Sequence, residues 1–138
     1  SRSTHMSVDV LRELGTEARY KNPQNAKPGA FGPVVILGAG DLGALFLDHL
    51  KSSPHDYYHG MSVLGFVDQS VELHGRHMRS FPVLGSLALV PSLVENEGLK
   101  GIIVAIANPP ATLREELATL ADTHKIHIHF WRVNLESQ

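Results

Sequence analysis

Three glycines in a G-x-G-x-x-G pattern are the residues of this chain best suited to holding a phosphate. Gly38, Gly40 and Gly43 follow an apolar, β-branched run at 34–37 and open an apolar helical pattern at 41–52. In such a unit the first glycine permits a tight turn, the second lets a pyrophosphate approach the backbone, and the third lets the helix pack closely. The N–H groups at the helix start then face the phosphates.

A carboxylate at the end of the next apolar run supports the same chemistry. Asp68 follows the run at 62–67 and lies 68 − 43 = 25 residues after Gly43. At the end of a second strand, a carboxylate can accept hydrogen bonds from the ribose hydroxyls of NAD. The predicted cofactor-binding residues are Gly38, Ala39, Gly40, Asp41, Leu42, Gly43, Asp68, Gln69, Arg76, Ala107 and Asn108. The alternative is a domain that keeps the glycines only for the turn.

The remaining elements must position these residues. Strands are predicted at 34–37, 62–67, 82–85, 101–107 and 125–133, and helices at 8–20, 41–52, 91–98 and after Asn108-Pro109-Pro110. After the leading helix the order is β-α-β-β-α-β-α-β. It predicts an α/β, Rossmann-like, open and mostly parallel five-stranded sheet of order 3-2-1-4-5, with helices on both faces. A ligand would sit between the carboxyl ends of the first and fourth strands.

Length and composition limit the alternatives. The chain has 138 residues, enough for one domain, and no cysteine, which excludes disulfides and thiolate chemistry. A net charge of −2 argues against a nucleic-acid partner, and the absence of an 18-residue apolar run argues against a membrane span. Residues 1–7 are interpreted as a cloning remnant, 8–32 as a helix and linker, and 33–138 as the nucleotide-binding domain.

Histidines and arginines offer weaker signals. His127 and His129 alternate on one face of the last strand and are expected to face solvent on a sheet edge, so no metal site is predicted. A basic loop comprises His74, Arg76, His77 and Arg79; it contacts a phosphate or an acidic group of a partner, or it stays solvated. No tyrosine has a lysine four residues later, so the acid/base pair of short-chain dehydratases is absent and no catalytic residue is assigned.

From Val34 onward the sequence resembles the CoA-binding-like Rossmann domain of bacterial membrane polysaccharide-biosynthesis proteins. The pieces that carry the resemblance lie at 35–43, 63–68, 74–76, 82–87 and 103–107. This family includes membrane-anchored UDP-sugar 4,6-dehydratases and epimerases, and transferases that load a sugar phosphate onto polyprenyl phosphate.

The resemblance implies an accessory domain, not catalytic alone, that works beside the catalytic domain of the same parent chain. It would lie in the cytoplasm, at the inner face of the membrane through the parent protein. The implied ligand is NAD, a nucleotide sugar or CoA, in that order. Two alternative functions remain: a stand-alone NAD-dependent oxidoreductase, and a ligand-free docking or dimerisation module. A homodimer is possible in this interpretation.

Overall fold

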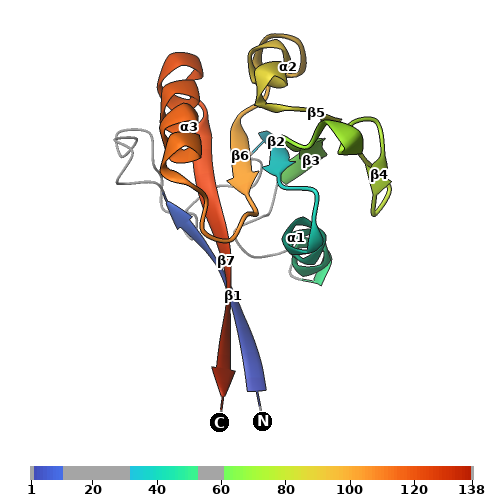
Figure 1. Ribbon diagram of the computed structural model, residues 1–138, viewed down its shortest axis with the longest axis vertical. Helices are drawn as coiled ribbons and strands as arrows, with labels where there is room; N and C mark the ends of the chain where they lie inside the picture. Colours follow the sequence, from blue (N-terminus) through green and yellow to red (C-terminus); the bar gives the residue numbers. More distant parts are fainter. Residues whose placement is uncertain (1, 11–31, 53–60, 138) are drawn as a thin grey trace.

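The computed structural model describes residues 2–10, 32–52 and 61–137, which form one sheet with helices on both faces (Figure 1). The strands are β1 (Arg2–Val10), β2 (Gly32–Leu37), β3 (Met61–Val67), β4 (His77–Met78), β5 (Phe81–Gly85), β6 (Gly101–Val104) and β7 (His127–Ser137). The helices are α1 (Asp41–Ser52), α2 (Val90–Glu97) and α3 (Ala111–His124), with 3₁₀ turns η3 (Val71–Leu73) and η4 (Leu87–Leu89).

The sheet confirms the predicted order and extends it at both edges. Its strands run β1-β7-β6-β2-β3-β5-β4, so the five predicted strands keep their 3-2-1-4-5 arrangement within a seven-stranded sheet. β2 pairs in parallel with both β3 and β6. The two additional strands are antiparallel, β1 against β7 and β4 against β5.

The N-terminal prediction was wrong where the structure describes it. Val8–Val10 belong to β1, not to a helix, and pair with β7 in a register that sets Val8 opposite Trp131. The alternation of Met6, Val8 and Val10 is a two-residue period, which suits a strand that adds to the edge of β7. Residues from Arg2, interpreted as a cloning remnant, also take part in this pairing, whereas 11–31 and 53–60 lie outside the described residues.

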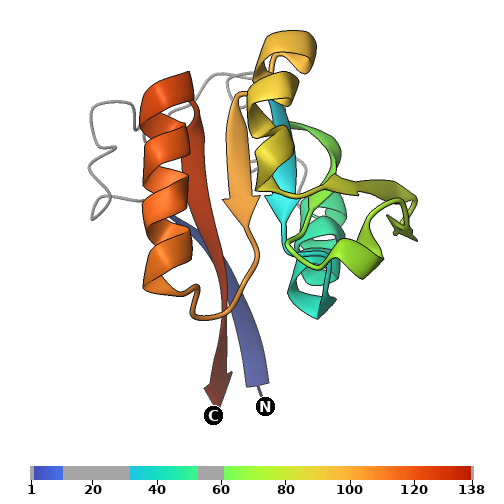
Figure 2. The ribbon, with the colours of Figure 1, turned by 45° about the horizontal axis from the view of Figure 1, so that its top comes forward.

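Alternating side chains of the central strands build one core on each face. In β2, Val35 and Leu37 face α2 and α3, whereas Val34 and Ile36 face α1. All four residues of β6 are buried, as expected for a parallel strand covered on both sides. Figure 2 shows α2 and α3 together in front of the sheet and α1 behind it. Among the described residues, no helix combines the length and apolar character that a bilayer crossing requires.

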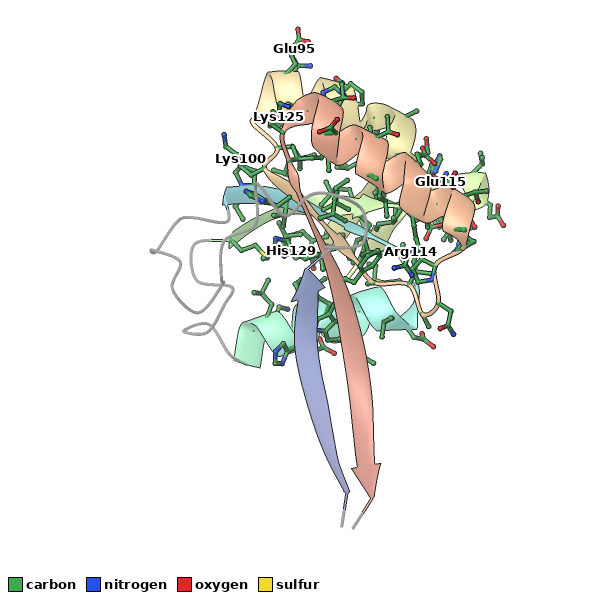
Figure 3. All side chains as sticks on the ribbon, turned by 90° about the vertical axis from the view of Figure 1, so that its left-hand side faces the viewer. Glu95, Lys100, Arg114, Glu115, Lys125 and His129 are labelled. Carbon is green, nitrogen blue, oxygen red and sulfur yellow. The ribbon has the colours of Figure 1, made fainter. Side chains whose placement is uncertain are left out.

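The expectation that His129 faces solvent was wrong. Strand β7 lies between β6 and β1, and the His129 side chain is only 5% exposed (Figure 3). Burial, with a smaller contribution from the charge of nearby His127, lowers the pKa of His129 to about 4. His129 is therefore held neutral inside the fold at physiological pH.

Acid should consequently destabilise the fold through His129. Between about pH 6.5 and pH 4 the unfolded chain binds a proton there that the folded chain does not, so stability falls as pH falls. We expect the free energy of unfolding to drop by about 2 kcal/mol from pH 7 to pH 5, measured by urea denaturation. A His129→Gln variant should lose less over this interval, whereas His124→Gln should keep the full loss because it retains His129. Equal losses in wild type and His129→Gln would contradict this assignment.

Candidate nucleotide site

The turn from β2 to α1 requires glycine at its first position. Gly38 has φ +110°, in the region that favours glycine, and a Cβ added there would lie 2.7 Å from the carbonyl oxygen of Ala105. Its N–H donates to the carbonyl of Val67 at 2.9 Å, and the N–H of Ala105 donates to Leu37 at 2.9 Å. The turn is thus tied to the strands on both sides of β2.

The third glycine sets how closely α1 approaches this turn. A Cβ at Gly43 would overlap the carbonyl oxygen of Gly38 and lie 3.0 Å from a ring carbon of Phe66. The first hydrogen bond from the helix back to the turn joins the N–H of Ala44 to the carbonyl of Gly40, at 3.1 Å. The backbone N–H groups of the residues before Ala44 therefore have no acceptor carbonyl within α1. They point out of the start of the helix.

The second glycine marks open space. Gly40 is exposed, and no heavy atom of the described residues lies within 4 Å of the position that a Cβ would occupy. Asp41, also exposed, begins α1 beside it, whereas Leu42 is partly buried against the core on the α1 face. A pyrophosphate fits this arrangement, because the missing side chain leaves room for it next to the positive end of a helix.

Asp68 joins the end of β3 to the glycine turn. One carboxylate oxygen accepts the N–H of Ala39 at 2.8 Å, and the other accepts the N–H of Ser70 at 2.9 Å. The Asp68 N–H donates to Gly85 at 2.8 Å, and its carbonyl accepts from Nε2 of His74 at 2.7 Å. Asp68 and the glycine turn, predicted together from the sequence, are therefore adjacent.

The neighbouring predicted residues have other contacts. The Oε1 atom of Gln69 accepts the N–H of Leu87 at 3.3 Å, which holds the Gln69 side chain against the start of η4. Arg76 is exposed, and its carbonyl accepts the N–H of Val83 at 2.7 Å. Within the basic loop, Arg79 pairs at 3.2 Å with Asp48 of α1, on the surface, so it points to the helix and not to Asp68.

Ala107 and Asn108 follow β6, the strand that pairs with β2 on the side away from β3. Both are exposed, and Asn108 has φ +53°, a left-handed conformation that asparagine tolerates. Because β2 leads to α1 on one face and β6 leads to α3 on the other, the two connections leave the sheet in opposite directions, as at the ligand-binding switch point of other open α/β sheets.

Two contacts were missed from the sequence alone, one at Asp68 and one between α3 and β7. Ser70 gives the backbone N–H that closes a turn on Asp68, and the Asp-x-Ser spacing is a signal for such a turn. Arg114, in the first turns of α3, stacks on Phe130 at 5.3 Å from guanidinium to ring centre, and Figure 3 shows it near the start of that helix. Nothing in the sequence distinguished Arg114 from a solvated arginine.

Among the described residues, no group of three or more His, Asp or Glu could hold a metal ion.

Comparison with known proteins shows the fold and not the family. No protein-family model matches the sequence, and no curated protein matches it. Among solved structures, UDP-D-quinovosamine 4-dehydrogenase from Vibrio fischeri matches with TM-score 0.59 and 14% identity, over 76% of this chain and 78% of that one. RSP, a Rex-family repressor, matches with TM-score 0.53 and 20% identity, over 68% of this chain and 41% of that one.

RSP has also been solved with β-NADH, and with β-NAD+ and operator DNA; these match with TM-scores of 0.52 and identities of 20% and 19%. They cover 68% of this chain, and 42% and 40% of the repressor chains. The chain thus spans about two fifths of the repressor's length.

The exclusion of a nucleic-acid partner is therefore corrected. A protein that contains this fold has been solved in complex with operator DNA. The net charge of −2 describes only the present chain, whereas the match covers 40% of that repressor. Net charge does not exclude nucleic acid as a partner of a protein with this domain.

Gly43 and Gly40 should respond differently to one added methyl group. Gly43→Ala should destabilise the domain by about 2 kcal/mol, since the methyl group meets backbone that cannot move aside without shifting α1. Gly40→Ala should change stability by less than about 0.5 kcal/mol, because its methyl group enters open space. Urea denaturation of both variants measures the difference. Equal stability of the two variants would mean that α1 does not pack this closely.

Proposed function

We propose that this chain is a nucleotide-binding domain whose ligand is NAD. The single observation that carries the proposal is the open space at Gly40, bounded by the start of α1 and by the turn that Asp68 holds. A pyrophosphate there would receive N–H groups from the first turn of α1. The repressor solved with NADH and NAD+ supports this choice of ligand, since it shares the fold.

The proposed contacts divide between the two halves of the ligand. Residues 38–43 hold the pyrophosphate, and Asp68, Gln69 and Arg76 face the adenosine. Each carboxylate oxygen of Asp68 accepts one N–H in the structure and has a second lone pair for a ribose hydroxyl. Ala107 and Asn108, which follow β6 beside β2, would lie next to the distal half of the ligand.

We further propose that the domain is an accessory part of a larger polysaccharide-biosynthesis protein, on the cytoplasmic side of a membrane. The structural similarity to a UDP-D-quinovosamine 4-dehydrogenase supports this context and keeps a nucleotide sugar as the second candidate ligand. The missing Tyr-x-x-x-Lys pair supports an accessory and not a catalytic role for the chain.

Ligand binding should raise the unfolding temperature. A ligand at 100 times its dissociation constant stabilises a fold by about 2.7 kcal/mol, which corresponds to several degrees. Among NAD(H), NADP(H), UDP-sugars and CoA at millimolar concentration, we expect NAD(H) to give the largest shift in a thermal-shift assay. Gly40→Val should abolish the shift and leave the unliganded midpoint unchanged, because its side chain fills space that the fold leaves open. If no ligand gave a shift, the docking-module rival would be favoured.

Charge at the adenosine end should favour NAD over NADP. A 2′-phosphate about 4 Å from the Asp68 carboxylate would be repelled by roughly 4 kcal/mol at an effective dielectric near 20. Arg79 cannot offset this while it pairs with Asp48, although Arg76 is exposed on the same loop. We expect calorimetry to show at least about tenfold tighter binding of NAD, and the same ratio in Arg79→Ala. Equal or tighter binding of NADP would mean that Arg76 or its neighbours read the ribose.

A further inference from the structure

Asp68 is the residue at which the segments around the site are joined. Its two carboxylate oxygens, its N–H and its carbonyl make four hydrogen bonds, which reach the glycine turn, the turn at 69–70, the loop at His74 and the end of β5. A residue that only reads a ribose would need its carboxylate directed to the ligand. Here one carboxylate oxygen is directed to the backbone of the turn that precedes α1, at 2.8 Å from the nitrogen of Ala39.

The bond to Ala39 has a specific consequence for the phosphate. It joins residues 29 positions apart and fixes the Gly38–Ala39 peptide, one residue before Gly40. The orientation of that peptide determines where Gly40 lies, and hence where the chain enters the first turn of α1. Since hydrogen bonds to a carboxylate are stronger than neutral ones, this contact is suited to fixing a glycine-rich turn that is otherwise free to adopt several conformations.

We propose that Asp68 is a positioning residue for the phosphate-binding turn, acting through the N–H of Ala39, in addition to any contact with ribose; this rests on the proposed function. This role implies a site for nucleoside diphosphate derivatives. Binding of pyrophosphate alone should therefore depend on Asp68. If Asp68 acted only on the ribose, the affinity for a ligand without ribose would not change when Asp68 is replaced.

Two variants and two ligands separate these roles. Asp68→Asn keeps the size but removes the charge and one of the two acceptors, so the bond to the Ala39 amide is either lost or reduced to a weaker neutral one. Glu95→Gln removes a charge from the exposed face of α2 and is the matched control. We expect Asp68→Asn to weaken inorganic pyrophosphate binding about tenfold and NAD binding by at least the same factor, with no change in the control. Pyrophosphate binding that is unchanged, or tighter, in Asp68→Asn would overturn the proposal.

A second readout does not depend on a ligand. The amide of Ala39 should exchange with solvent faster, measured by NMR hydrogen exchange, in Asp68→Asn than in Glu95→Gln. Unchanged exchange would also overturn the proposal. If wild type bound neither ligand, the proposed function would fail, while this exchange rate would still decide whether Asp68 holds the turn.

Asp68→Glu keeps the test usable if the asparagine variant does not fold. A glutamate can still bind a ribose, but its longer side chain displaces the carboxylate from Ala39. Faster exchange of the Ala39 amide and weaker pyrophosphate binding in Asp68→Glu are expected. Wild-type values for both would overturn the positioning role.

Discussion

The close approach of α1 to the end of β2 is the constraint on which the candidate site depends. It exists only because position 43 has no side chain, since a Cβ there would overlap the carbonyl of Gly38. The approach brings the start of the helix over the carboxyl end of the central strand and leaves Gly40 facing open space. A single methyl group at Gly43 would separate helix and turn, whereas the same group at Gly40 would enter open space. One short segment thus combines a glycine that packing requires with a glycine that leaves the start of α1 accessible.

The rest of the fold keeps that segment in place from three directions. The central position of β2, between β3 and β6, gives its end a hydrogen-bonded neighbour on each side. The turn is held to β3 by Gly38 and to the segment after β6 through Leu37 and Ala105. Asp68 adds a side-chain bond to the N–H of Ala39, next to the amide of Gly38 that is bonded to β3. Burial on both faces of the central strands stabilises this framework, because α1 covers one face and α2 and α3 cover the other.

Local patterns predicted the centre of the fold, and long-range pairing decided its edges. The glycine spacing at 38–43 and the apolar runs specify strand, turn and helix within a few residues, and the handedness of parallel crossovers then gives the strand order. The pairing of β1 with β7 depends on a partner more than 100 residues away, so the sequence near Val8 could not distinguish strand from helix. The same missing partner led to β7 being predicted as an edge strand and His129 as exposed, whereas His129 is buried. Within the candidate site, the proximity of Asp68 to the glycine turn was predictable from strand order. The contacts of Gln69 with Leu87 and of Arg79 with Asp48 were not, since both depend on how irregular loops fold.

The central claim is that a nucleotide's pyrophosphate binds where the glycine turn enters α1. The most direct measurement is an NMR titration of the labelled domain with NAD that follows every backbone amide. The largest changes are expected at residues 38–43 and 68–70, with smaller changes after β6 and none at the far end of α2, near Glu97. No change at residues 38–43 on saturation with NAD, or changes confined to other parts of the sheet, would contradict this account.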